Sequence, residues 1–294
     1  MARDSDPLIA SACELCTALD KRSIRPIIAG GLGLYLRELF LNQERQARYP
    51  LRMESRTTRD IDVFLTVEMI VDLHVVEAVR DVLRELGYSP KPEAFYFQFV
   101  RTSTSDAEGE GAVRHVKVDL MAAVPDGESA SLVTGTAPRI KPIGASEIHA
   151  RRAPEAELIH VRPAEISVPA SGRKPIRVLV PSSINYLILK LHALRDNVDL
   201  QPDFGRHHAW DIMTIVAGMV EEDWNTARFT RDAYAEAHCF QEAITISRDL
   251  FGNASSLGFI RLQENEAFRA SRDELVSYIA NIRDDLTELF GYSN

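Results

Sequence analysis

Cysteines, long apolar runs and basic residues near the C-terminal end are all scarce in this 294-residue chain. It has only three cysteines, whereas disulfide frameworks usually hold a larger and even number of them, so we expect a reducing compartment. No stretch approaches the ~20 apolar residues that a membrane helix needs. The first residues, MARDSDP, carry acids where a signal peptide has basic residues. These absences predict a cytoplasmic protein that has no membrane partner.

The composition is otherwise that of an ordinary globular protein, with 45% hydrophobic and 26% charged residues. This length and composition predict one large or two small domains with a real core. The net charge of −9 comes wholly from residues 199–294, which hold 8 Lys and Arg against 17 Asp and Glu. Such an acidic third is a poor surface for a phosphate backbone, so any nucleic-acid contact is expected on the N-terminal part.

Hydrophobic periodicity predicts an α+β chain, with a mixed β-sheet domain and flanking helices over 1–180 and a helical bundle domain over 181–294. In the first domain, apolar spacing predicts helices over 8–20, 32–47 and 68–87. Alternation and β-branched runs predict strands over 24–29, 60–65, 95–101, 112–121, 164–168 and 176–180. In the second domain, we predict helices over 182–197, 206–220, 231–250 and 265–290.

Three aspartates on two predicted strands are the strongest candidates for chemistry. Asp60 and Asp62 stand two positions apart, so on a strand both carboxylates point to the same face. Asp119 lies between Val118 and Leu120 in a second strand, which leaves its carboxylate on the polar side. Clustered carboxylates repel one another unless a cation lies among them, and oxygen ligands favour Mg²⁺ or Mn²⁺. Two such ions can clamp the attacking and leaving oxygens of a phosphoryl transfer.

A Gly-Gly pair adds context to these acids. Gly30 and Gly31 follow a predicted strand and open a predicted helix, a geometry in which backbone N–H groups receive phosphate. An Asp-x-Asp pair alone is common on a solvated strand face, and a Gly-Gly pair is often only a turn. Their combination in this order is more specific, and it indicates a site for metal ions and phosphate.

The chain resembles the DNA polymerase β-like nucleotidyltransferase superfamily, whose signature is a Gly-Gly or Gly-Ser turn, a D-x-D strand and a third Asp on a neighbouring strand. Within that superfamily, the segment RTTRDID, from Arg56 to Asp62, is similar to the R-x-[ST]-x-D-[IL]-D motif of AbiEii/AbiGii-type toxins. A second block of that family, K-x-x-A…R…K-D-x-x-D, is similar to Lys190–Arg195 and the stretch that ends at Asp211. The resemblance covers residues 24–220.

The resemblance implies a small mixed-sheet nucleotidyltransferase domain followed by a helical bundle, with the active site in a cleft between them. It implies that Asp60 and Asp62 hold two Mg²⁺ or Mn²⁺ ions, and that Asp119 completes the second ion site and favours deprotonation of the attacking hydroxyl. Lys190 would neutralise phosphate charge. The other residues implied in nucleotide binding are Gly30, Gly31, Arg56, Thr58 and Asp211.

Two departures separate the chain from the family pattern. Leu32 stands where the family often has Ser or Thr directly after the glycines, so one side-chain contact to phosphate is lost. The K-D pair that precedes the position of Asp211 is replaced by His207 and His208. These changes bear on substrate choice and leave the three aspartates in place.

The predicted reaction is transfer of a nucleoside monophosphate from an NTP to an acceptor hydroxyl, with release of pyrophosphate. By resemblance the acceptor would be RNA, such as the 3′ end of a tRNA, and a cognate antitoxin protein would restrain the enzyme. Two alternatives stay open. One is transfer to a protein or to a small molecule such as an aminoglycoside, for which the acidic C-terminal third would supply an acid-lined pocket. The other is a catalytically silent nucleotide-binding protein, although three clustered carboxylates argue against it.

Two further motifs are weaker. Cys13 and Cys16 have the spacing of a redox or zinc pair, but no second pair follows, so we expect buried residues on one helix face. His207, His208 and Asp211 have a spacing compatible with one metal ion, but no fourth ligand is evident. A polar helix face is the simpler interpretation.

Overall fold

The computed structural model describes residues 7–41, 47–49, 60–105, 112–135, 137–169 and 174–292. The predicted nucleotide contacts at Arg56 and Thr58 lie outside these ranges. The chain forms two compact units. The first holds residues 7–41, 60–154 and Pro163–Val180, and the second holds residues 47–49, Glu155–Arg162 and the chain from Pro181 onward.

The first unit is built on a mixed β-sheet. Ten strands belong to it within the described residues, in the order β6-β7-β8-β5-β2-β1-β10-β9, with β4 paired to β5 and β3 to β4. The strands are β1 (Ile27–Ala29), β2 (Asp60–Leu65), β3 (Ser89–Pro90), β4 (Gln98–Ser105), β5 (Ala112–Ala122), β6 (Val133–Thr134), β7 (Arg139–Pro142), β8 (Ala150–Arg152), β9 (Ala164–Val168) and β10 (Ile176–Val180). The predicted mixed-sheet fold is confirmed, and the sheet is larger than the small one we expected.

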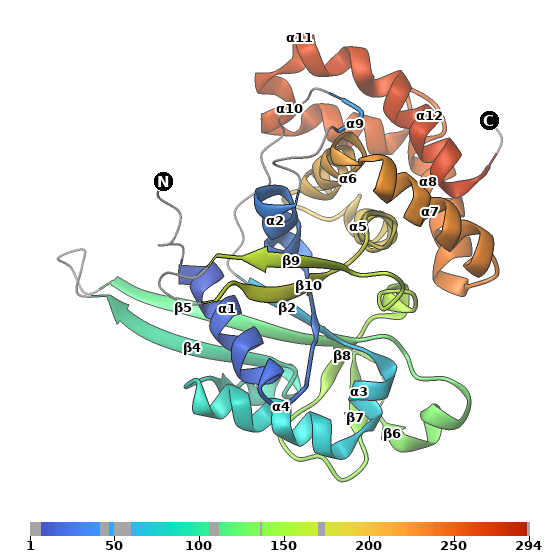
Figure 1. Ribbon diagram of the computed structural model, residues 1–294. Helices are drawn as coiled ribbons and strands as arrows, with labels where there is room; N and C mark the ends of the chain where they lie inside the picture. Colours follow the sequence, from blue (N-terminus) through green and yellow to red (C-terminus); the bar gives the residue numbers. More distant parts are fainter. Residues whose placement is uncertain are drawn as a thin grey trace. The chain divides into compact units, whose positions relative to one another are not determined.

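The alternation of apolar and polar residues places the core of this unit. Ile61 and Val63 on β2, and Val118 and Leu120 on β5, are completely shielded from solvent. Helix α1 (Pro7–Asp20) packs against β2, β10 and α4 (Leu73–Glu85). Figure 1 shows α1 and α4 lying along one side of the sheet. Helix α2 (Gly30–Phe40) follows β1 directly and packs against β2 and β9.

The helix predicted over 68–87 is two helices, α3 (Val67–Val71) and α4. The break lies at Asp72, whose carboxylate accepts hydrogen bonds from the backbone N–H groups of His74 and Val75 and so caps α4. Helix α4 ends at Glu85 rather than at Gly87, which follows with φ +79°. Sequence periodicity continues across the cap, because both helices bury apolar residues in the same unit.

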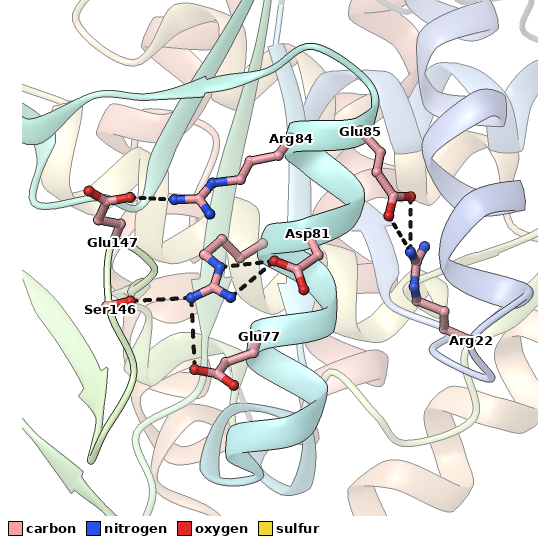
Figure 2. Close-up of polar contacts among 8 residues, drawn as sticks. Arg22, Glu77, Asp81, Arg84, Glu85, Ser146 and Glu147 are labelled. Carbon is pink, nitrogen blue, oxygen red and sulfur yellow. Dashed lines mark hydrogen bonds and ion pairs between the residues drawn. The ribbon is translucent and has the colours of Figure 1, made fainter.

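Ion pairs hold the exposed face of α4 to its neighbours, as Figure 2 shows. Arg84 contacts Glu147 at 2.5 Å, and Arg80 donates to the Ser146 hydroxyl at 3.2 Å. Glu85 accepts from Arg22, which follows α1, at 2.6 Å. Each exposed pair of this kind contributes about 0–1 kcal/mol, so the pairs orient α4 more than they stabilise the fold.

The second unit is helical. Its helices are α5 (Ser183–Asn197), α6 (Arg206–Gly218), α7 (Glu221–Tyr234), α8 (His238–Phe251), α9 (Leu257–Glu264), α10 (Glu266–Ala270), α11 (Arg272–Leu275) and α12 (Ile279–Phe290). Helix α5 is its centre, because it is buried along most of its length and packs against α6, α7 and α8. Short 3₁₀ turns complete the two units at Pro92–Ala94, Gly127–Leu132, Pro154–Ala156 and Val276–Tyr278.

The first two helices predicted in this unit are confirmed, and the later boundaries are wrong. The predicted helix over 231–250 is α7 and α8, separated at 235–237, and α7 begins ten residues earlier than predicted, at Glu221. Its start is fixed by Asp223, whose carboxylate accepts from the backbone N–H of Val220. The predicted helix over 265–290 is interrupted several times, and α9 was not predicted.

Candidate functional site

The predicted acids meet on two adjacent strands of the first unit. Strands β2 and β5 run parallel, in a register that pairs Asp60 with Lys117 and Asp62 with Asp119. Cross-strand partners share a face of the sheet, so these four side chains lie on the face opposite to Ile61. We call them the aspartate patch. The structure therefore brings all three predicted aspartates together, and it adds a lysine that the sequence reasoning did not single out.

Lys117 bridges two of the aspartates. Its Nζ lies 3.0 Å from Oδ2 of Asp60 and 3.1 Å from Oδ2 of Asp119. Burial lowers the pKa of Lys117, but its hydrogen bonds with both carboxylates and their charges outweigh that effect, and the pKa is raised. The ammonium is therefore held in its charged form. The available sequence signal was its place two residues before Asp119, which puts both side chains on one face.

Asp119 is more enclosed than Asp60, with 14% of its side chain exposed against 39%. Burial raises the pKa of Asp119, and the opposing effect of Lys117 does not fully cancel it. Its Oδ1 atom is buried and accepts no hydrogen bond from the residues that the structure describes. A buried acceptor without a donor costs free energy, so this atom is available to a cation.

Gly30 makes room for Asp62. The residue follows β1, begins α2 and has φ +60°, a conformation that favours glycine. A Cβ atom at this position would lie 1.6 Å from Oδ2 of Asp62, so only glycine fits beside that carboxylate. Asp62 is also the ladder partner of Ala29, the last residue of β1. The carboxylate thus lies at the N-terminal end of α2, beside the Gly30-Gly31 turn that we expect to receive phosphate.

Leu32, which directly follows the two glycines, is only 1% exposed. Its side chain belongs to the core of the first unit. Replacing a hydroxyl with this leucine therefore adds an apolar contact on the inner side of α2, and phosphate contacts at this turn would come from backbone groups.

The oxygen donors of the aspartate patch fit Mg²⁺ or Mn²⁺, because both ions prefer carboxylate ligands. The bare Oδ1 atom of Asp119 is the structural observation that supports this fit. As the side chains are placed, no three acidic, histidine or cysteine residues within the described ranges are gathered closely enough to hold an ion. Lys117 forms ion pairs with oxygen atoms of two of the three aspartates, so an incoming ion would have to compete with its ammonium.

Lys190 and Asp211 lie in the second unit, where they contact each other. Nζ of Lys190 on α5 is 2.6 Å from Oδ2 of Asp211 on α6, and their side chains are 6% and 1% exposed. This is a buried ion pair between two helices, a relation that the sequence reasoning did not foresee. Contacts of either residue with nucleotide stay a prediction.

The histidines at the start of α6 find partners close to them in the chain. His207 contacts the carboxylate of Asp203, and its ring centroid lies 3.8 Å from that of His208. Across the part of the chain that the structure describes, no metal-binding group includes them. The pair is a polar feature at the start of α6.

Cys13 and Cys16 lie buried on α1, as expected from their spacing. Burial raises the pKa of the Cys13 thiol to about 11 and that of Cys16 to about 12. Such thiols are not thiolates near neutral pH, and a redox pair needs the thiolate. They act as small apolar residues of the core.

Comparisons with known proteins include a distant structural likeness. No family model and no curated protein matches the chain. Among solved structures, the chain is similar to the solution structure of the antibiotic-resistance factor ANT(2'')-Ia, with 13% sequence identity and a TM-score of 0.35, over 82% of this chain and 99% of that chain. At this level the likeness carries no argument about function.

The described helices include none with the length and apolar character needed to cross a membrane.

Proposed function

We propose that this protein is a metal-dependent nucleotidyltransferase, which transfers a nucleoside monophosphate from an NTP to an acceptor hydroxyl and releases pyrophosphate. The observation that carries the proposal is the strand register that pairs Asp62 with Asp119 and leaves Asp60 on the same face. The turn at Gly30, with Asp62 packed against it, adds a helix N-terminus beside the acids. Carboxylates and helix N-termini are the groups that bind the metal and phosphate parts of a nucleotide.

The residues of the patch would act mainly by position and charge. Asp60 and Asp62 would hold two divalent ions, and Asp119 would complete the second ion site. Bound Mg²⁺ or Mn²⁺ would neutralise charge that develops on the phosphoryl oxygens and lower the pKa of the attacking hydroxyl. Two paired strands keep the carboxylates fixed, so little reorganisation is needed during the reaction. The backbone N–H groups of Gly30 and Gly31 would receive the triphosphate.

RNA is the acceptor that we propose, such as a tRNA 3′ end, with a cognate antitoxin as protein partner. The support is the resemblance of the Arg56–Asp62 segment and of the Lys190–Asp211 block to AbiEii/AbiGii-type toxins. The three cysteines lie in the described ranges and are free, which supports a cytoplasmic setting.

A small cationic acceptor, of the aminoglycoside kind, is the second candidate. The charge distribution favours it, because residues 199–294 carry 17 acids against 8 basic residues. A polycation is attracted to such a segment, whereas an RNA phosphate backbone is repelled by it.

Label transfer tests the proposal and separates these acceptors. Each of the four NTPs, labelled at the α-phosphate, is incubated with Mg²⁺ or Mn²⁺ and with total tRNA, total protein, an aminoglycoside mixture or the enzyme alone. We expect label in RNA, lost in the variant Asp62→Asn. Label in another acceptor would replace RNA by that acceptor. No label in any sample, with NTP binding intact by calorimetry, would overturn the proposed activity and leave a silent nucleotide-binding protein.

A further inference from the structure

Lys117 places a positive charge between two carboxylates of the aspartate patch. Its ammonium lies 3.0 Å and 3.1 Å from carboxylate oxygens on two different strands. Asp60 on β2 is 39% exposed and Asp119 on β5 is 14% exposed, so both charges are partly removed from water. Partly buried like charges that share a site repel strongly. A lysine between them offsets that repulsion without any bound ion.

We propose that Lys117 is a built-in counter-ion, which holds Asp60 and Asp119 together in the metal-free protein and withdraws from them when a divalent cation binds. The inference rests on the proposed function, because it concerns the same site. It adds a regulatory feature, since the metal affinity of the patch is set by competition with a residue of the chain itself.

The competition follows from the atoms involved. Lys117 uses Oδ2 of Asp60 and Oδ2 of Asp119, and a cation bound among the three acids would need oxygens of the same two residues. Lys117 leaves Oδ1 of Asp119 without a donor among the described residues. A divalent ion carries twice the charge of an ammonium and can also use that oxygen, so it remains the better partner.

The side chain of Lys117 is suited to leave. It is 27% exposed, and its four-carbon stem lets the ammonium move toward water without any change in the strand. The backbone is fixed by pairing with β2 on one side and with β4 on the other, where Val100 is its partner. Only the charged end of the residue needs to move, so the acids keep their register when the ion arrives.

Mn²⁺ binding measured by calorimetry tests the inference without any nucleotide or turnover. We compare wild type with Lys117→Gln and Lys117→Met, which both remove the charge and keep most of the side-chain length. Both variants are expected to bind Mn²⁺ at least about tenfold more tightly, because the competing cation is gone.

Arg151→Gln is the matched control. Arg151 is exposed, lies on β8 and acts on Asp119 through its charge. The variant Arg151→Gln removes one positive charge, as the Lys117 variants do, but it leaves the Lys117 bridge between the aspartates in place. We expect a change of less than about threefold, because the longer-range effect is screened by water and salt.

A second measurement examines the metal-free state. In EDTA, Lys117→Gln is expected to melt at a lower temperature than wild type, and saturating Mn²⁺ is expected to raise its melting temperature by more than it raises that of wild type.

Unchanged or weaker Mn²⁺ binding in both neutral variants would overturn the inference. Label transfer that requires Asp62, combined with unchanged Mn²⁺ binding, would overturn this inference alone. Tighter Mn²⁺ binding without any label transfer would support it and overturn the proposed activity alone.

Discussion

Asp62 keeps its place because the residue beside it, Gly30, has no side chain. The carboxylate comes from β2, and the glycine follows β1 directly, so the two meet where α2 begins. Two requirements coincide at Gly30, a positive φ and a missing Cβ, and glycine alone meets both. The position is therefore a sensitive place to test whether the carboxylate geometry matters for binding.

We predict that Gly30→Ala loses Mn²⁺ binding and label transfer, because its Cβ would displace the Asp62 carboxylate. Gly87→Ala is the control for backbone strain alone. Gly87 has φ +79°, and the nearest atom to an added Cβ is 3.8 Å away. The variant Gly87→Ala therefore costs about 1–2 kcal/mol of unfolding free energy and leaves the site unchanged. Calorimetry with Mn²⁺ and urea unfolding of both variants separate the effects. Normal Mn²⁺ binding by Gly30→Ala would contradict the proposed role of Asp62.

A pH dependence of stability is predicted from His192 on α5. Burial lowers the pKa of His192, so the folded protein disfavours the charged form. The stabilising contribution is present above the unfolded pKa of about 6.5 and is lost as the pH falls toward the folded pKa. His192→Gln should therefore reduce the loss of unfolding free energy between about pH 7 and pH 5, by up to about 1.4 kcal/mol per pH unit.

The control for this titration is His238→Gln, because the side chain of His238 is 78% exposed. Urea unfolding at several pH values measures the slope for both variants and for wild type. His149 in the first unit has a pKa lowered by burial as well, so part of the wild-type slope persists in His192→Gln. Equal slopes for wild type and His192→Gln would contradict the assignment.

The three aspartates could be predicted from the sequence because strand alternation places residues two apart on one face. The role of Lys117 could not, since lysines near acids on a strand are usually solvated and only the register to Asp60 reveals the bridge. Pairing of Lys190 with Asp211 was equally hidden, because nothing in local periodicity says which side chains meet between two helices.

At the level of secondary-structure elements, the Lys190–Asp211 pair joins α5 to α6 inside the second unit. We predict that Lys190→Met costs about 3–5 kcal/mol of unfolding free energy, because it removes the ammonium that pairs with the buried carboxylate of Asp211. The double variant Lys190→Met/Asp211→Leu should recover most of that loss, since the buried carboxylate is removed together with the ammonium. Urea unfolding measures both, with Lys21→Met at an exposed position as the control.

The outcome separates a structural role from a purely functional one. If Lys190→Met unfolds at the same urea concentration as wild type, the ion pair does not stabilise the helices. A loss of stability that the double variant restores would establish that the pair holds α5 and α6 together.

Helix and strand centres were predictable, and several boundaries were not. Strands β2, β9 and β10, and helices α1, α5 and α6, have strong local patterns, and the structure confirms them. The missed boundaries depend on single polar residues, such as Asp72, which caps α4, and Asp223, which fixes the start of α7. Such side chains form hydrogen bonds with nearby backbone groups and so decide where a helix begins. A hydrophobic pattern contains no information on these polar residues.

For the whole molecule, the two units are not two successive stretches of chain. Residues Glu155–Arg162 belong with the helices, where the side-chain amide of Asn185 donates to the carbonyls of Leu158 and Val161 at 2.7 Å and 3.1 Å. Periodicity cannot predict this assignment, because the hydrogen bonds join residues more than twenty positions apart. The predicted boundary at 180 coincides with the end of the sheet unit at Val180.

The central claim is that Asp60, Asp62 and Asp119 together carry out metal-dependent nucleotidyl transfer, and one comparison of label transfer tests it most directly. Wild type, Asp62→Asn and Asp119→Asn are assayed with α-labelled NTPs and Mn²⁺, beside Asp72→Asn, which changes an acid that caps α4. We predict a loss of at least about a hundredfold in the two patch variants, and a rate within about threefold of wild type for Asp72→Asn. Equal transfer by wild type and Asp62→Asn would contradict the account.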